Sequence, residues 1–321
     1  MRGKRESSPG IREQSWFSFA AALPLHWLIA LAIGGVGLQC EFGALLAGLA
    51  ILGSAFILSW ATELSERDIP QQLALLVLAL VSVLPEYAVD LHFAIKAAED
   101  PQYAHYAVAN MTGANRLLIG LGWAAVALVA CRRSRTTALR LEPHHRIEIR
   151  FLLFATLYSF LIPLDGYINL FDAAVLLGLF LWYAFSAAHG GYEEVEMVGP
   201  AARFDTEFDD FGRRLWALAL LLFAGYAIFI SAEPFADGLV HIGRSRAIDE
   251  FILVQWVAPL ASESPEFVIA IIFALRLRGG MGLGALISSK VNQWTLLVGA
   301  LPIAYCIASV SFRGLPLDAR Q

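Results

Sequence analysis

The chain has 321 residues, of which 58% are hydrophobic and only 16% are charged, and its mean hydropathy is +0.63. Soluble domains carry about 25% charged residues, so this composition excludes a soluble domain and favours an integral membrane protein. The formal charge of −5 says little, because the charges cluster in connecting segments, but the sequence has no interleaving of basic and aromatic residues of the kind that binds nucleic acid. Three cysteines without paired spacing predict neither a disulfide framework nor a zinc site.

Nine stretches are apolar enough to be interpreted as membrane-spanning helices, since a span needs about 20 mostly apolar residues. In chain order they cover residues 16–39, 43–65, 70–98, 103–131, 149–163, 166–188, 213–233, 247–277 and 281–311. The sequence therefore predicts an all-α polytopic fold with about nine transmembrane helices.

The first apolar stretch follows a basic tail, residues 1–15, and has two interpretations. A secretory signal peptide has the same order of charge and hydrophobicity, but its apolar core is usually about 7–15 residues long. Because the stretch 16–39 is longer, the favoured interpretation is a membrane-anchoring helix.

The basic residues set the expected orientation, because cytoplasmic loops carry an excess of Lys and Arg. They are enriched in the tail 1–15 and in the loop 132–150, and four predicted crossings separate these two segments. Both are therefore expected in the cytoplasm, as is the acidic linker 189–212. The stretches 70–98 and 247–277 then cross in opposite directions, which is typical of transporters built from inverted repeats.

Two of the apolar stretches contain a proline directly followed by a glutamate. They read Val81-Ser-Val-Leu-Pro-Glu-Tyr-Ala-Val-Asp90 and Ala261-Ser-Glu-Ser-Pro-Glu-Phe-Val-Ile-Ala270, and the next stretch in each case contains an asparagine, Asn115 or Asn292. An acid inside a membrane helix costs roughly 2.5–3.5 kcal/mol and is a candidate functional residue. The proline beside it frees a backbone carbonyl that needs another partner.

A hydroxyl lies one helical turn before each glutamate, at Ser82 before Glu86 and at Ser262 before Glu266. Carboxylate, hydroxyl and freed carbonyl oxygens are hard ligands that suit Na⁺, Ca²⁺ or a proton. A helix kink around one buried, protonated acid is the alternative for either unit alone. Recurrence of the unit in the opposite orientation favours a shared cation site near the bilayer midplane.

These residues resemble the α-repeats of the sodium/calcium exchanger family within the calcium/cation antiporters. The family pattern is Gly-Thr-Ser-Leu-Pro-Glu on one helix and Gly-Asn-x-x-Gly-Ser-Asn on the next. Here the first repeat reads Val81-Ser-Val-Leu-Pro-Glu86 and Asn110-Met-Thr-Gly-Ala-Asn115, and the second reads Ala261-Ser-Glu-Ser-Pro-Glu266 and Ser288-Ser-Lys-Val-Asn292. The chain is thus similar to a divergent, bacterial-type member.

The resemblance implies an exchanger core of two inverted five-helix repeats. The implied division is a cytoplasmic tail (1–15), an extra N-terminal helix (16–39), a first repeat (43–188), the acidic cytoplasmic linker (189–212) and a second repeat (213–321). The second repeat lacks its last two helices, which either a partner supplies or a truncated gene product has lost.

The resemblance also implies the residues that hold the transported cation. The implied cation-binding positions are Glu86, Glu266, Ser82, Ser262, Asn115, Asn292, Asn110 and Ser288. Of these, Glu86 and Glu266 are the implied direct metal ligands. The implied function is that of a secondary antiporter, not an enzyme, which exchanges Na⁺ or Ca²⁺ for protons or Na⁺ by alternating access. It has no resident cofactor, its partners are the lipid bilayer and inorganic cations, and its expected location is a bacterial plasma membrane.

The chain departs from the family pattern at positions that bear on sodium. The hydroxyl before the motif asparagine is replaced by Ala114 and Val291. Lys290 stands in place of a glycine, where its ammonium can pair with Glu263 or Glu266. Two further acids, Asp90 and Glu263, have no counterpart in the pattern, so Asp90, Glu263 and Lys290 are candidates for proton coupling. The alternative for Lys290 is a side chain that snorkels to the inner membrane surface.

Other functions have less support in the sequence. A non-transporting scaffold or sensor derived from an exchanger is favoured by these departures, but retention of both Pro-Glu units argues against it. An intramembrane protease needs paired aspartates or a His-Glu-x-x-His motif, and the sequence has neither. The adjacent His144 and His145 are interpreted as part of a solvated loop.

Overall fold

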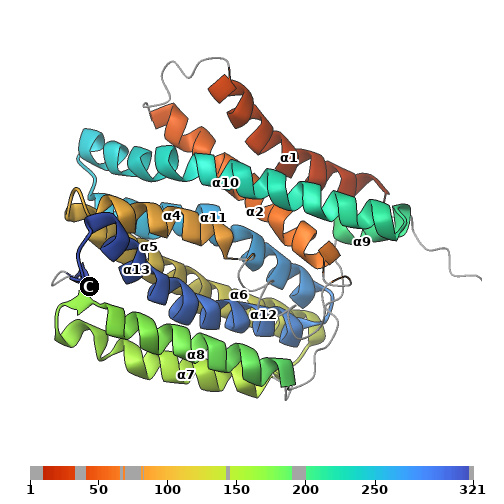
Figure 1. Ribbon diagram of the computed structural model, residues 1–321. Coiled ribbons are helices and arrows are strands. Elements are labelled where there is room, and N and C mark those ends of the chain that lie inside the picture. Colours follow the sequence, from red (N-terminus) through yellow and green to blue (C-terminus); the bar gives the residue numbers. More distant parts are fainter. Residues whose placement is uncertain are drawn as a thin grey trace, which may run out of the picture.

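The computed structural model describes residues 10–32, 41–65, 68, 81, 83–141, 145–189 and 200–317, which are almost entirely helical (Figure 1). The α-helices are α1 (Gly10–Ala32), α2 (Glu41–Ser65), α4 (Leu84–Lys96), α5 (Gln102–Asn115), α6 (Trp123–Ser134), α7 (Arg146–Ser159), α8 (Leu170–His189), α9 (Pro200–Glu207), α10 (Asp210–Arg246), α11 (Glu250–Leu275), α12 (Gly279–Asn292) and α13 (Val298–Ser309). Two π-helical segments, η2 (Arg116–Gly122) and η5 (Gln293–Leu297), join α5 to α6 and α12 to α13.

The predicted all-α polytopic fold is confirmed. Among the described residues, seven helical segments are long and apolar enough to cross a membrane. They are Phe42–Ser65, Gln102–Ser134, Arg146–Leu164, Leu170–Ala187, Asp210–Arg246, Glu250–Leu275 and Gly279–Ser309. The shorter apolar helix Trp16–Ile29 adds one further candidate. Part of the predicted stretch 70–98, in which α4 lies, is outside the described residues.

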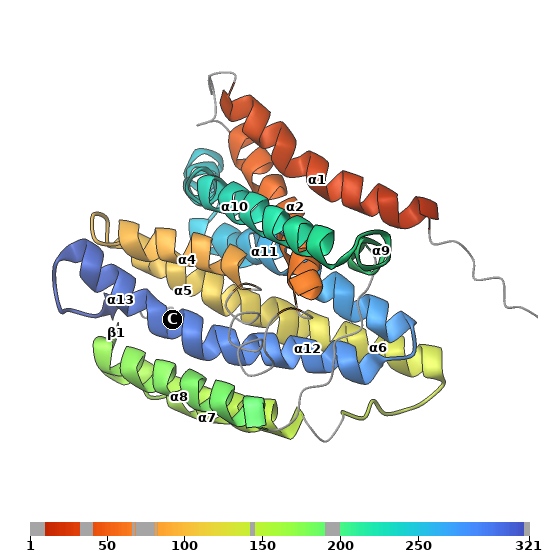
Figure 2. The ribbon, with the colours of Figure 1, turned by 45° about the vertical axis from the view of Figure 1, so that its right-hand side comes forward.

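The helices form three layers. α1 covers α2, which packs along α10; α4, α5, α11, α12 and α13 form the middle layer, and the α7–α8 pair lies on the opposite side (Figures 1 and 2). The largest hydrophobic core joins residues of α2, α4, α5, α10 and α11, with Trp27 and Phe93 fully buried in it. The middle layer is therefore enclosed on both sides by apolar helices.

The same order of elements occurs twice, as expected for two repeats. α2, α4, α5, η2 and α6 correspond in order to α10, α11, α12, η5 and α13. The repeats interlock, because α2 packs on α10, α5 on α11 and α4 on α13. The Nη2 atom of Arg244, at the end of α10, lies 2.9 Å from Oε1 of Gln102, at the start of α5. The end of α4 and the start of α11 therefore lie on the same side of the molecule, so these two helices run in opposite directions.

Helix α10 is longer than the predicted stretch 213–233. Its 37 residues begin after Asp209, whose side chain accepts a hydrogen bond from the backbone N–H of Gly212 at 2.9 Å. The polar residues after position 233 lower the hydropathy and ended the predicted stretch. In the structure Asp237 is paired with Lys96 and His92, both of α4. The helix α10 therefore continues through this polar segment.

A short antiparallel ladder joins the C-terminal part of the described chain to the turn between α7 and α8. β1 (Tyr167–Ile168) pairs with β2 (Leu315–Pro316), and the backbone N–H of Leu317 donates to the carbonyl of Gly166 at 2.9 Å. Gly166 has φ of +79°, a conformation that glycine adopts without strain. The segment after α13 is thereby held against the α7–α8 pair.

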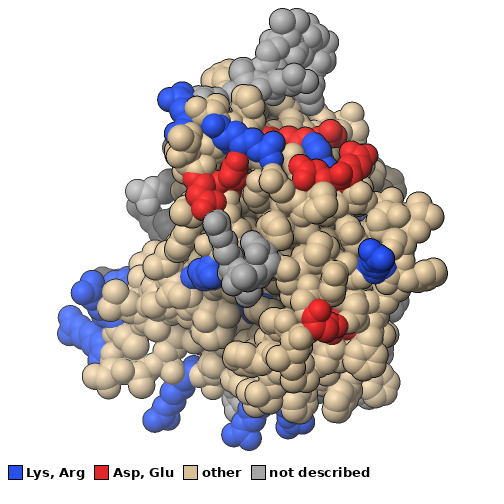
Figure 3. Space-filling view, turned by 90° about the vertical axis from the view of Figure 1, so that its left-hand side faces the viewer, with Lys and Arg blue, Asp and Glu red and all other residues tan. Residues whose placement is uncertain are grey.

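Charged residues are few on the surface. The end-on view in Figure 3 is mostly formed by uncharged residues, and Asp and Glu gather in a few places. Large hydrophobic side chains such as Phe160, Phe185 and Phe229 are exposed on the helices. These exposed apolar faces suit contact with lipid tails.

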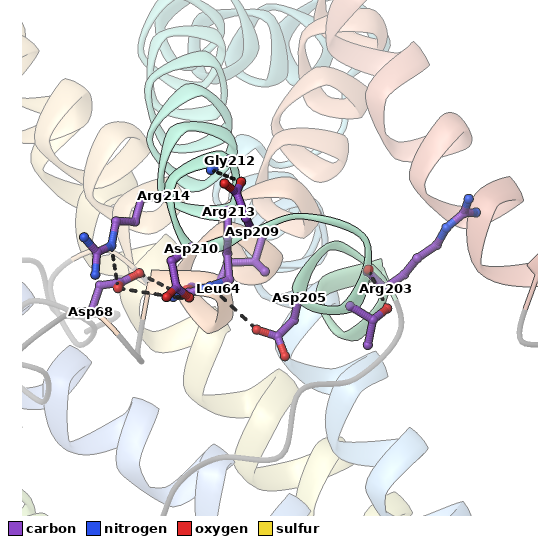
Figure 4. A network of polar contacts seen from close by, with 10 residues as sticks. Leu64, Asp68, Arg203, Asp205, Asp209, Asp210, Gly212, Arg213 and Arg214 are labelled. Atoms are coloured by element: carbon purple, nitrogen blue, oxygen red, sulfur yellow. Dashed lines mark hydrogen bonds and ion pairs between the residues drawn. The ribbon is translucent and has the colours of Figure 1, made fainter.

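A polar network fastens the start of α10 to the end of α2 (Figure 4). The buried Arg213 donates to the carbonyl of Leu64 at 3.0 Å and to Asp68 at 2.7 and 3.2 Å, and Arg214 donates to Asp68 at 2.7 Å. Partial burial opposes ionisation of Asp68, but the hydrogen bonds and positive charges of Arg214 and Arg213 outweigh it and hold the pKa of Asp68 below its ordinary value.

Asp68 is therefore expected to stabilise the fold most above about pH 4, the unfolded pKa of an aspartate. This contribution is lost as pH falls through the lower pKa of the folded state. We expect Asp68→Asn to cost about 2 kcal/mol at pH 7 and to lessen the loss of stability between about pH 5 and 3. Thermal unfolding of the detergent-purified chain, followed by tryptophan fluorescence across pH, measures both. If the stability of the native chain and that of Asp68→Asn depend on pH in the same way, Asp68 does not have this role.

Candidate functional site

The two Pro-Glu units occupy different positions in their helices. Pro85 and Glu86 lie in the first turn of α4, where the missing N–H of proline costs no helical hydrogen bond. Pro265 and Glu266 lie inside α11. There proline cannot donate to the carbonyl one turn earlier, which belongs to Ala261. Each repeat thus brings a glutamate together with an irregular or weakened helical turn.

Four ionisable side chains from α4, α11 and α12 meet inside the helix bundle. Glu86, Glu263 and Lys290 are each at most 1% exposed. Glu266 is partly buried, and its Oε2 atom is completely covered. Glu86 is near enough to Glu263, Glu266 and Lys290 to interact with all three electrostatically. The sequence prediction that Glu86 and Glu266 come from the two repeats to one place agrees with this proximity.

Many acceptor oxygens in and around this cluster are buried and have no hydrogen-bond partner among the described residues. They are both carboxylate oxygens of Glu86, one each of Asp90, Glu263 and Glu266, and the amide oxygens of Asn110, Asn115 and Asn292. A buried acceptor without a partner costs about 1–3 kcal/mol, and native structures contain few of them. Because all of these atoms are acceptors, the arrangement suits a proton or a hard cation.

The two motif asparagines lie at equivalent places in the repeats. Asn115 is the last residue of α5 and Asn292 is the last residue of α12, and a π-helical segment begins directly after each. A π-helical turn leaves the regular backbone ladder and is often found at functional sites. The sequence showed the asparagines but contained no signal for the π-helical segments.

Two further predicted ligands, Ser262 and Asn110, form hydrogen bonds with specific partners. Ser262 is buried, and its hydroxyl donates to the carbonyl of Ala258 at 3.3 Å. The Nδ2 atom of Asn110 donates to Oδ1 of Asp90 at 2.8 Å, which joins α5 to α4.

Another predicted ligand, Ser288, has its hydrogen-bond partner outside the carboxylate cluster. The hydroxyl of Ser288 points to Oε1 of Glu148 on α7, at 3.5 Å. Ser82 lies outside the described residues.

Lys290 is completely buried, so the alternative in which it snorkels to the membrane surface is wrong. Its Nζ atom donates to Oε1 of Glu263 at 3.2 Å and also to Oε1 of Gln293. The Nε2 atom of Gln293 donates to the same Glu263 oxygen at 2.6 Å. Gln293 was missed in the sequence, although a polar residue directly after the motif asparagine in an apolar stretch was a usable signal.

The cluster is not a closed metal cage. Among the described residues, no three His, Cys, Asp or Glu side chains converge closely enough to hold a metal ion. A cation held by Glu86 and Glu266 would take its remaining ligands from amide, hydroxyl and carbonyl oxygens or from water. Such mixed ligation suits an ion that has to leave again.

The structure corrects one prediction outside the cluster. His145, expected in a solvated loop, is buried, with its Nδ1 atom 3.9 Å from Oε2 of Glu148. Gly284 of α12 leaves room for the imidazole ring, since a Cβ atom at that position would overlap it. Gly284 comes from a helix far away in the sequence, so the local sequence around His145 does not reveal that this histidine is buried. His144 lies outside the described residues.

Comparison with known proteins gives a family match over most of the chain. A family model described as sodium/calcium exchanger protein matches residues 41–188 and 216–318. Among curated proteins, an uncharacterized membrane protein of Methanocaldococcus jannaschii is 28% identical over 153 residues. That match spans 47% of this chain and 47% of the relative, which is about half of each.

Solved structures match over a larger share of the chain. The H⁺/Ca²⁺ exchanger CAX superposes with a TM-score of 0.90 at 46% sequence identity, covering 96% of this chain and 78% of that chain. The sodium-calcium exchanger NCX_Mj superposes with a TM-score of 0.55 at 19% identity, covering 87% of this chain and 84% of that chain. The second likeness shows the fold alone.

Proposed function

The chain belongs to the sodium/calcium exchanger protein family, and from this membership we propose that it is a secondary antiporter which exchanges Ca²⁺ or Na⁺ for protons or Na⁺. It is an integral membrane protein and a cation antiporter, not an enzyme. We propose Ca²⁺ as the first cation to test and the proton as its counter-ion. The similarity to a structure described as an H⁺/Ca²⁺ exchanger, at 46% identity, supports that pair.

The observation that carries the proposal is that neither carboxylate oxygen of Glu86 has a hydrogen-bond partner among the described residues. Glu86 is 1% exposed and lies close to Glu263 and Glu266. Because Lys290 already pairs with Glu263, Glu86 and Glu266 are the acids that cannot both stay ionised in a buried site without a further positive charge. A transported cation can supply that charge in one stage of the cycle, and protons can supply it in the other. Ca²⁺ and protons therefore compete for the same oxygens, which is the requirement for exchange.

The proposed mechanism is alternating access about this site. Glu86 from the first repeat and Glu266 from the second are the direct ligands, and Ser82, Ser262, Asn115 and Asn292 contribute further oxygens. The inverted direction of α4 and α11 supports this arrangement, because repeats of opposite orientation can open to either side in turn. Asn110 and Ser288 act through Asp90 and Glu148, their hydrogen-bond partners. Asp90 is the proposed additional proton acceptor.

We place the protein in a bacterial plasma membrane with its N-terminus in the cytoplasm. The excess of Lys and Arg in residues 1–15 and 132–150 supports this orientation. The acidic linker 189–212 then lies on the same side.

Flux in proteoliposomes tests the function. The purified chain is reconstituted with a pH-sensitive dye inside the vesicles, and Ca²⁺, Na⁺ or K⁺ is added outside. A Ca²⁺ gradient directed inward is expected to drive protons outward. Conversely, a pH gradient with an acidic vesicle interior is expected to drive ⁴⁵Ca²⁺ uptake. Sealed vesicles that move no ion under any gradient would favour the non-transporting scaffold instead.

The two motif asparagines provide a test of the ligand set. Asn115→Ala and Asn292→Ala each remove one unpartnered amide oxygen, so each is expected to raise the Ca²⁺ concentration for half-maximal flux about tenfold. Asn169→Ala is the control, because its side chain caps the start of α8 away from the cluster. Equal Ca²⁺ dependence in all three variants would remove the asparagines from the proposed site.

A further inference from the structure

Lys290 lies in an environment in which a positive charge has a specific use. Its side chain and that of Glu263 are 0% exposed, and Gln293 is 3% exposed. The three side chains form a closed triangle, since Lys290 and Gln293 both donate to Oε1 of Glu263 and Lys290 also donates to Gln293. The ammonium, carried by α12, is therefore held in one place by Glu263 of α11 and Gln293 of η5.

The charges around this triangle are all negative. Glu86, Asp90, Glu263 and Glu266 each interact electrostatically with Lys290. Among the described residues, Lys290 is the one basic side chain that interacts electrostatically with all four of these acids. One oxygen of Glu263 faces the ammonium, while its other oxygen has no hydrogen-bond partner within the described part of the chain. Without Lys290, the cluster would gain a full uncompensated negative charge.

We propose that Lys290 is a tethered cation that permanently occupies one cation position of the site and thereby limits which ions the site accepts. The ammonium neutralises Glu263 and leaves Glu86 and Glu266 for the transported ion. Two carboxylates match the charge of one Ca²⁺ or two protons. This inference rests on the proposed function, and it adds a residue that determines how much external positive charge the site takes.

A buried ion pair that only supports the fold is the other role for these residues. Removal of either partner then leaves a buried charge without compensation and destabilises the protein. Both single variants would weaken Ca²⁺ binding or leave it unchanged. A tethered cation predicts opposite effects, because Lys290→Met adds net negative charge to the site and Glu263→Gln adds net positive charge.

The test is equilibrium ⁴⁵Ca²⁺ binding to the full chain purified in detergent at constant pH. We expect Lys290→Met to bind Ca²⁺ at least about tenfold more tightly than the native chain, and Glu263→Gln at least about tenfold more weakly. The double variant Glu263→Gln/Lys290→Met is expected to recover at least tenfold relative to Glu263→Gln. These are the shifts expected when a unit charge lies a few ångströms from a divalent ion in a partly screened site.

The double variant protects the test against misfolding of Lys290→Met. It contains neither buried charge, and it differs from Glu263→Gln only by the ammonium. Equal Ca²⁺ affinity of these two variants would overturn the inference, and so would weaker binding by both single variants. Absence of Ca²⁺ binding by the native chain and every variant would instead contradict the proposed function, and the inference with it.

Discussion

Replacement of Glu86 by Gln is expected to reduce Ca²⁺-driven proton movement at least about 30-fold, and Glu266→Gln is expected to do the same. Glu86 is 1% exposed and its two oxygens have no hydrogen-bond partner among the described residues. Glutamine keeps the shape of the side chain but removes its charge and replaces one acceptor by a donor. Loss of one charged partner in a buried site costs roughly 2–5 kcal/mol, which corresponds to about 30-fold or more.

The measurement is dye-reported proton flux in proteoliposomes with matched protein content. Glu99→Gln is the control, since Glu99 is an exposed glutamate in the turn that follows α4. Flux at the native level in either Glu86→Gln or Glu266→Gln would remove that glutamate from the transport site. Loss in one variant alone would show that the two repeats contribute unequally.

The sequence predicted the parts of the site that depend on local chemistry. Proline followed by glutamate is unusual inside an apolar stretch, and its recurrence identified Glu86 and Glu266 as equivalent residues. The pairing of Lys290 with Glu263 was one of two alternatives, and the structure confirms it at 3.2 Å. Charge alone could not choose between the alternatives, because Glu263 and Glu266 lie less than one helical turn apart on α11.

Features that depend on packing between distant segments were not predictable in this way. The direction of Ser288 depends on α7, which supplies Glu148, and the burial of His145 depends on the space above Gly284. Helix α10 continues past position 233 because α4 supplies a lysine for Asp237. The π-helical segments differ from α-helix by one extra residue in a turn, and hydrophobic periodicity over so few residues does not detect this change.

Replacement of Gly113 by Ala is expected to destabilise the protein by about 3 kcal/mol and to reduce transport. Gly113 lies on α5 where it crosses α11, and a Cβ atom there would overlap the backbone carbonyl oxygen of Gln255 and lie 2.7 Å from its carbonyl carbon. A backbone carbonyl inside a helix cannot rotate away as a flexible side chain does. The helices must therefore separate, and an overpacked contact costs about 1–3 kcal/mol.

Gly178→Ala is the matched control for this crossing. Gly178 lies inside α8, and a Cβ atom there meets nothing within 4 Å. Alanine favours a helix over glycine by about 0.5–1 kcal/mol, so this variant is expected to unfold at the native temperature or slightly above it. Thermal unfolding in detergent compares the two variants. Because α5 carries Asn115 from the first repeat and α11 carries Glu266 from the second, a separation at Gly113 also changes the distance between the two halves of the proposed cation site. If Gly113→Ala unfolds like Gly178→Ala and transports normally, the close approach of α5 and α11 is not required for either property.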